Sequence, residues 1–199
     1  MTPIFELPSL ATELRKNTRA HHHELDRQPI LSRLTVQDVS AEDYATALAA
    51  LRGPQEALED ALANFAAPCT NNPFQPRLEL LDSDLHNLGC APYPLMIPPP
   101  SSHHLESWLG IRYVLEGSRL GGAVLFRHLQ PRLSQLPMSF FEDALHNGQD
   151  CCARFWRDIA EFQKGLKTEA VIQAAQESFK FYIEHLVCVT NIRSHPSSV

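Results

Sequence analysis

Apolar residues recur at helical spacing through most of the chain. In the first such segment, which extends to about Arg27, Leu10, Leu14 and Leu25 fall on one face. No strictly alternating pattern longer than a few residues is visible, so strands are not expected. The pattern therefore predicts an all-α fold of about seven or eight helices. The expected helices cover residues 9–27, 40–67, 76–89, 103–130, 139–147, 150–166 and 168–193.

Polar residues at the starts of these segments suggest how the helices begin. Ser40 with Asp43 and Ser139 with Glu142 have the spacing of a capping box, in which the first side chain accepts from the backbone of the second. Ser9 and Thr168 are simpler N-cap candidates. Two breaks are also expected. Gly53-Pro54 should kink or divide the second helix, and Gly148 should separate 139–147 from 150–166.

The segment between Cys90 and Ser102 contains five prolines, which favour an extended loop rather than regular structure. This loop is too short to separate two domains, so residues 1–199 are expected to form one domain. Residues 1–8 and 194–199 are expected to be irregular at its ends.

The stretch from Tyr113 to Leu125 looks helical but carries three interior glycines. Each interior glycine costs about 1 kcal/mol relative to alanine. On a helix, Gly117, Ser118, Gly121 and Gly122 share one arc of about 140°, a strip almost without side chains. The strip predicts close packing against something flat or bulky. That could be a neighbouring helix or a planar ligand.

Composition narrows the classes of protein. The chain is 44% apolar and 20% charged, with a formal net charge of −6, which is ordinary for a soluble protein and argues against a nucleic-acid-binding surface. No apolar run is long enough to span a membrane, and the N-terminus does not look like a signal peptide, so a cytoplasmic location is expected. The five cysteines lack metal-binding spacing and suit reduced thiols.

The first predicted helix carries three consecutive histidines, His21, His22 and His23. Helical geometry sends their rings about 100° apart, so they cannot all serve one site. His23 points to solvent, His21 lies within the apolar stripe, and His22 lies at its edge, four residues before Asp26. A histidine in that position can be an ordinary edge residue. It can also be a metal ligand whose second nitrogen is held by a carboxylate.

Two motifs together resemble the heme oxygenase family. The segment Leu14 to Asp26 is similar to the family's first helix, in which a threonine precedes the proximal heme ligand by four residues, and here Thr18 selects His22. The pattern from Tyr113 to Gly122 is similar to the distal helix of bacterial members, including those that partner bacterial phytochromes. The last two helices also resemble the family's C-terminal region.

The resemblance implies an enzyme that cleaves heme b, using O2 and external electrons from a donor such as ferredoxin. Its products would be biliverdin, carbon monoxide and ferrous iron, and a bacterial phytochrome could accept the biliverdin. It implies His22 as the proximal iron ligand, oriented by Asp26. The distal wall would consist of Gly117, Ser118, Gly121 and Gly122. The other implied heme contacts are Thr18, Arg15, Arg19, Tyr113 and Phe179, with Arg154 and Arg157 as weaker candidates.

The chain departs from the mammalian pattern at Ser118, where those members carry an aspartate that organises the proton-delivering water. A serine can bind water but carries no charge. Two alternatives therefore stand beside the oxygenase. One is a heme carrier or sensor that binds heme in the same pocket without turnover. The other keeps the helical scaffold but replaces heme by a di-iron site or an organic substrate. A di-iron site would need inward-facing carboxylates and histidines from several helices. Within the first helix, a one-residue change of phase would present His21 instead of His22.

Overall fold

The computed structural model describes residues 9–65, 72–162 and 165–195. Its regular structure is entirely helical over these residues, which confirms the predicted all-α class. The elements are α1 (Ser9–Asp26), α2 (Pro29–Ser32), a 3₁₀ turn η1 (Arg33–Thr35), α3 (Ala41–Ala63), α4 (Leu78–Asn87), α5 (Leu105–Leu129), α6 (Ser139–Phe162) and α7 (Thr168–Ser194). None of the described helices is both long enough and apolar enough to cross a membrane.

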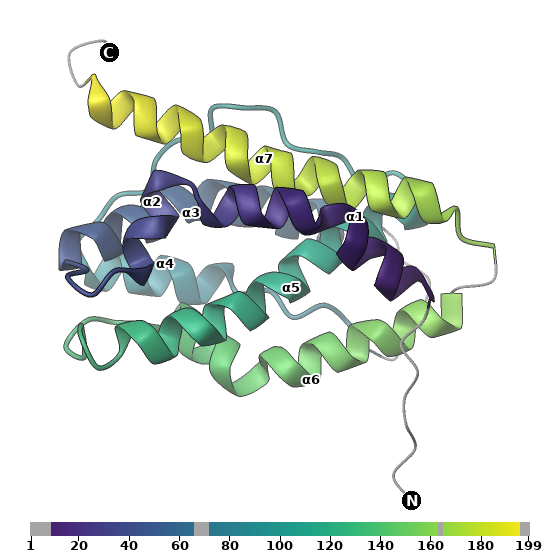
Figure 1. Ribbon diagram of the computed structural model, residues 1–199, viewed down its shortest axis with the longest axis horizontal. Helices are drawn as coiled ribbons and strands as arrows, with labels where there is room; N and C mark the ends of the chain where they lie inside the picture. Colours follow the sequence, from purple (N-terminus) through teal and green to yellow (C-terminus); the bar gives the residue numbers. More distant parts are fainter. Residues whose placement is uncertain (1–8, 66–71, 163–164, 196–199) are drawn as a thin grey trace, which may run out of the picture.

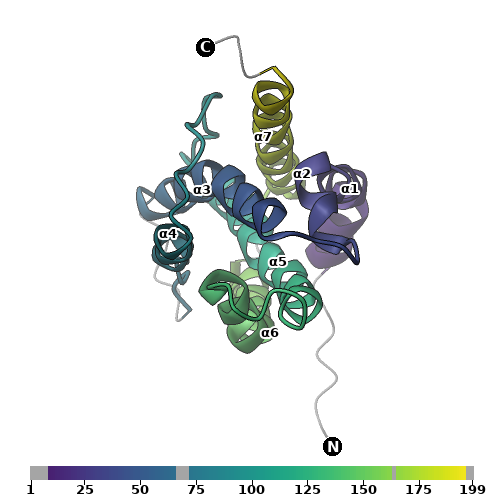
Figure 2. The same cartoon turned by 90° about the vertical axis from the view of Figure 1, so that its left-hand side faces the viewer.

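Helix α5 runs through the middle of the molecule. Figure 2 shows it end-on, with α7 above it, α6 below it, and α3 and α1 on its two sides. Its apolar face, with Leu109, Ile111 and Leu115, is almost fully buried in a core shared with α1, α3, α6 and α7. The glycine-bearing helix is therefore the element on which most of the others pack.

Two glycines allow neighbouring helices to come unusually close to α5. A Cβ placed on Gly110 would lie 2.6 Å from the Cβ of Ala174 and 2.7 Å from the carbonyl oxygen of Val171, so α7 packs directly on the α5 backbone there. A Cβ placed on Gly148 of α6 would lie 3.2 Å from the Cβ of Arg119. A side chain at Gly110 would overlap α7, whereas one at Gly148 would make a contact with α5 that is tighter than ordinary van der Waals packing.

This packing explains why the expected break at Gly148 is wrong. Helix α6 continues from Ser139 to Phe162 without interruption. The glycine permits a close approach to α5, and the resulting contact stabilises a helical glycine that would be costly in isolation. Helix α3 likewise continues through Gly53 and Pro54 and is not divided there.

Helix starts agree with the sequence only where the cap is local. The capping box between Ser40 and Asp43 is present in full. The one expected at Ser139 is replaced, because Asp84 of α4 accepts from the backbone N–H groups of Ser139 and Phe140 at 3.0 and 2.9 Å. Thr168 is the first residue of α7 rather than its cap, which is Lys167.

The remaining expectations about the connections and ends have mixed outcomes. The proline-rich segment before α5 has no regular structure, as expected. Ser194 belongs to α7 rather than to an irregular tail, whereas 1–8 and 196–199 lie outside the described residues, as does Cys69. The short α2 and η1 were not predicted. The other four cysteines are free thiols, as expected.

Replacing Gly110 or Gly121 of α5 by alanine should change the unfolding free energy in opposite directions. Gly110→Ala should lower the unfolding free energy by about 1–3 kcal/mol, because the new methyl overlaps α7. Gly121→Ala should raise it by up to about 1 kcal/mol, because nothing lies within 4 Å of the new methyl. Urea denaturation measures both values. Equal destabilisation by the two substitutions would contradict this account of the packing.

Candidate functional site

A hydrogen bond between Thr18 and Tyr113 joins α1 to α5. The two hydroxyl oxygens are 3.1 Å apart. The Thr18 hydroxyl donates to the carbonyl oxygen of Leu14 at 2.7 Å, so its hydrogen is already used and Tyr113 is the donor between them. Burial raises the pKa of the Tyr113 phenol above its usual value, which keeps that donor protonated. The Tyr113 ring is fixed against Phe155 and Trp156 of α6.

This contact sets the register between the two helices. Both α1 and α5 run from right to left in Figure 1, and their ribbons move apart toward the left. One helical turn beyond the contact lie His22 on α1 and Gly117 on α5, and two turns beyond it lie Asp26 and Gly121. The backbones of α1 and α5 approach each other at very few points, whereas α1 packs extensively on α7. His22 and Gly117 therefore have the same helical offset from the contact between α1 and α5.

His22 has the surroundings of a metal-binding imidazole. Its Nδ1 lies 3.0 Å from Oδ2 of Asp26, and its side chain remains 55% exposed. The Phe179 ring of α7 packs edge-on against it with centroids 6.0 Å apart. A histidine whose Nδ1–H is held by a carboxylate is fixed in one tautomer and presents Nε2 as a lone-pair donor.

The neighbouring histidines have different surroundings. Nδ1 of His21 is buried and has no hydrogen-bond partner among the described residues. Nε2 of His23 accepts a long hydrogen bond, 3.4 Å, from Nε of Arg19 on the solvent side of α1. Only His22 of the three has a carboxylate positioned at its ring. The geometry therefore favours His22 over His21 as the ligand.

The glycine strip of α5 divides into an open part and a packed part. No heavy atom beyond the helix itself lies within 4 Å of a Cβ placed on Gly117 or Gly121. At Gly122 a Cβ would lie 3.0 Å from the Cβ of Ala144, so that glycine serves the contact with α6. Leu120 and Val124, on the open side, leave 40% and 63% of their surface exposed. The open part is an apolar, side-chain-poor face.

Ser118 stands between these two parts and is held by two hydrogen bonds. Its hydroxyl donates to the carbonyl oxygen of Leu115 at 2.7 Å. The same oxygen accepts from Nη2 of Arg77, also at 2.7 Å. The Ser118 hydrogen is therefore committed to the backbone, and the polar group with unused donors beside it is the Arg77 guanidinium.

Arg77 is a buried cation that the sequence analysis missed. The residue is 2% exposed, and its Nε and Nη1 have no hydrogen-bond partner among the described residues. Its guanidinium lies over the Phe140 ring, 4.4 Å from the centroid. Burial, followed by the charge of Arg119, lowers the pKa of Arg77 to about 10, so it stays protonated at neutral pH. No local signal identifies it, because Arg77 precedes α4 in a segment without periodicity and meets Ser118 only through the fold.

A buried set of ion pairs lies within α5 and between α5 and α6. Arg112 donates to Oδ2 of Asp158 at 2.8 Å, and both side chains are at most 1% exposed. Nε of Arg119 lies 3.3 Å from Oε2 of Glu116. These pairs hold the inner side of α5 in place with charges that are mutually compensated, unlike the charge on Arg77.

The predicted basic residues lie on the outer side of α1 and on α6. Arg15 and Arg19 are exposed, and the Arg15 guanidinium is 5.7 Å from the centroid of the Trp156 ring. Arg154 is engaged by Asp150 and by the sulfur of Cys151. Arg15 therefore lies near Tyr113, whereas the structure shows no such link for Arg154.

The site offers one metal-ligating side chain, His22, rather than the several ligands that a bare metal ion needs. Within the described residues, no three histidine, cysteine, aspartate or glutamate side chains gather to hold a metal ion, so the di-iron alternative gains no support. A single neutral imidazole opposite bare helical backbone suits the iron of a planar macrocycle. The exposed apolar side chains beside the glycines suit its hydrophobic surface.

Comparisons with known proteins agree with this arrangement. A model of the heme oxygenase family matches residues 8–103, which include α1. A heme oxygenase from Xanthomonas campestris is 36% identical over 98 residues, which are 47% of this chain and 57% of that relative, so the match spans little more than half of the relative's length.

Solved structures extend the similarity to α5 and α7. The NO- and CO-bound heme oxygenase from Neisseria meningitidis superimposes with a TM-score of 0.67 at 25% identity, covering 92% of each chain. Heme oxygenase-1 from the cyanobacterium Synechocystis, in complex with heme, gives a TM-score of 0.66 at 16% identity, covering 96% of this chain and all of that one (100%), and shows the shared fold. These matches show that the chain is similar to heme oxygenases in sequence over residues 8–103 and in fold over most of its length.

Proposed function

We propose that the protein is a heme oxygenase that converts heme to biliverdin, carbon monoxide and ferrous iron, using O2 and electrons from an external donor. The proposal rests on the hydrogen bond between Thr18 and Tyr113, from which His22 and Gly117 are each one helical turn away, and on the open backbone at Gly117 and Gly121. Heme supplies both the iron that activates dioxygen and the carbon skeleton that is oxidised. The roles proposed for the protein's side chains are therefore to bind heme, to position it and to deliver protons.

On the proximal side, His22 would hold the iron through Nε2, because Asp26 already lies against its Nδ1 and fixes the ring. The carboxylate fixes the tautomer and the orientation of the imidazole. Phe179 covers one edge of the ring. With His22 as the single protein ligand, bound heme would supply an iron that can activate dioxygen.

On the distal side, Gly117 and Gly121 let the macrocycle lie against the helix backbone. A Cβ at either position would project into that space, since nothing else occupies it. Leu120 and Val124 supply apolar surface along the same face. Gly122 acts differently, because its lack of a side chain lets α5 pack on α6. One turn earlier on α5, Ser118 bonds Arg77.

Proton delivery is assigned to the Arg77 and Ser118 pair rather than to Ser118 alone. The serine hydrogen is donated to the Leu115 carbonyl, which leaves the serine without a free donor. The unused Nε and Nη1 of Arg77 can orient water, and its positive charge stabilises negative charge that develops nearby. In this role the guanidinium replaces the carboxylate that mammalian members use to organise water.

Arg15, Arg19 and Tyr113 are the proposed anchors of the heme propionates. The two guanidinium groups are exposed and carry the charge that propionates require. The Tyr113 hydroxyl donates its hydrogen to Thr18, so it has none free for a propionate. Tyr113 would therefore accept a hydrogen bond from an arginine that holds the propionate, or exchange its bond to Thr18 for one to the propionate when heme binds. Thr18 is 2% exposed, and we assign it to the link between the two helices.

The acceptor of the product, the electron donor and the cellular location are also proposals. Biliverdin is the chromophore precursor of bacterial phytochromes, and the resemblance to phytochrome-associated members makes such a protein the proposed acceptor. A reduced ferredoxin in the cytoplasm is the proposed electron donor. The commitment of the Ser118 hydrogen favours one competing function, a heme carrier or sensor that binds without turnover. A turnover assay separates the two functions.

Replacing His22 by alanine should abolish turnover. Wild-type protein mixed with hemin, a reductant and O2 should lose the heme absorption band and form biliverdin, identified by its spectrum and mass. His22→Ala should lose the normal heme spectrum and its biliverdin production, with helix content unchanged in far-UV circular dichroism. His21→Ala is the matched control and should behave like the wild type. Persistence of intact heme in the wild type would favour the carrier, and loss of the spectrum in His21→Ala would reverse the ligand assignment.

Replacing Arg77 by methionine should slow turnover without preventing heme binding. The substitution keeps the length and apolar contacts of the side chain but removes its charge and donors, and the backbone N–H of Arg77 still bonds Glu59. The single-turnover rate should fall about a hundredfold, the usual contribution of a positioned proton-transfer group, with the hemin dissociation constant nearly unchanged. An unchanged rate would remove Arg77 from the proton path.

A further inference from the structure

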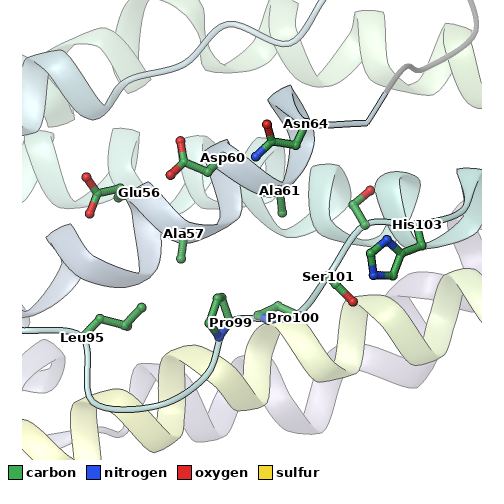
Figure 3. A pocket seen from close by; sticks show the side chains of 11 residues that line it. Glu56, Ala57, Asp60, Ala61, Asn64, Leu95, Pro99, Pro100, Ser101 and His103 are labelled. Carbon is green, nitrogen blue, oxygen red and sulfur yellow. The ribbon is translucent and has the colours of Figure 1, made fainter.

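The proline-rich segment before α5 forms one side of a groove that the proposed heme site does not use. The groove has a volume of about 490 Å³ and lies between α3 and residues 95–103 (Figure 3). It is lined by Glu56, Ala57, Asp60, Ala61 and Asn64 of α3 and by Leu95, Pro99, Pro100, Ser101, Ser102 and His103. None of these side chains belongs to the proposed heme site on α1, α5 and α7.

The wall formed by the proline-rich segment is apolar and held in place. Leu95, Pro99 and Pro100 face the groove, and Leu95 leaves 38% of its surface exposed. The backbone N–H of Tyr93 bonds the carbonyl oxygen of Ala49 at 3.1 Å, and the Tyr93 hydroxyl accepts from Arg193 at 3.1 Å. Proline fixes its own backbone angle, so this wall loses little freedom when a partner binds.

The α3 side combines short apolar side chains with negative charge. In Figure 3, Ala57 and Ala61 point toward the proline-rich segment. Glu56 and Asp60, also on α3, line the same groove, one turn apart. Glu56 is paired with Arg52, but no ion pair to Asp60 is present among the described residues. The carbonyl end of α3, which finishes at Ala63, adds partial negative charge.

We propose that this groove docks a lysine or arginine side chain displayed by a partner protein. The aliphatic stem of such a side chain fits between Ala57, Ala61 and Pro99, while its cationic head reaches Asp60 and Glu56. Long basic side chains bury their methylene groups in this way while keeping the charge at a polar rim. His103 is the only lining residue that can itself carry positive charge.

The exposure of the lining favours a protein over a free small cation. Asp60, Leu95, Pro99, Ser101 and His103 are all exposed. Small-molecule sites cover most of their ligand's surface, and a groove this open would leave a small cation largely in water. A partner protein would cover the groove with the surface that surrounds its basic side chain. The docking is independent of heme chemistry.

The test is an NMR titration of the full-length, ¹⁵N-labelled protein with two blocked pentapeptides, one alternating leucine with arginine and the other alternating leucine with glutamate. The arginine peptide should shift the amide signals of Ala57, Ala61 and Leu95 in a saturable way, and the glutamate peptide should not. Asp60→Asn should weaken binding about fivefold, and Ala61→Phe, which fills the groove, should abolish it. Asp38→Asn, at an exposed carboxylate elsewhere, is the matched control and should bind like the wild type.

Each other outcome would overturn the proposal. Binding that leaves these three amides unshifted, or that survives both groove substitutions, would place the peptide elsewhere. Equal affinity for n-butylguanidinium would replace the protein partner by a small cation. The hemin spectrum of each variant is recorded in parallel, so that a failure of the heme site is distinguished from a failure of the groove.

Discussion

The hydrogen bond between Thr18 and Tyr113 is the constraint on which the proposed site depends. It is the point at which α1 and α5 meet through polar side chains, and it lies one turn before both His22 and Gly117. A shift of one residue along either helix would rotate the histidine or the glycines by about 100° and separate them. The ring of Tyr113 is in turn fixed by Phe155 and Trp156, so α6 determines the register as well.

The same helix, α5, uses glycine for two different purposes. At Gly110 and Gly122 a neighbouring helix occupies the space that a side chain would take, and this packing offsets the cost of placing a glycine within a helix. At Gly117 and Gly121 nothing fills the space, so the cost is uncompensated in the heme-free protein. Leu120 and Val124 beside them are exposed. Helix packing accounts for Gly110 and Gly122, and the proposed heme binding is the function assigned to Gly117 and Gly121.

The features that could be predicted from the sequence are those set by residues close together along the chain. Helical periodicity, the capping box at Ser40 and the four-residue spacing of His22 and Asp26 are all local, and the structure contains them. The continuity of α6 through Gly148 depends instead on Arg119, and the start of α6 depends on Asp84. The pairing of Arg77 with Ser118 joins residues 41 positions apart. Contacts between distant segments of this kind leave no pattern in a single sequence.

The central claim is that the space over Gly121 belongs to heme, and a bulky side chain there tests it most directly. Hemin titration of the wild type and of Gly121→Leu, each with its heme-free unfolding free energy, separates binding from folding. The account predicts that Gly121→Leu folds at least as stably as the wild type, because its side chain meets open space, and that it binds hemin at least about tenfold more weakly. Equal hemin affinity in a variant of unchanged stability would contradict it.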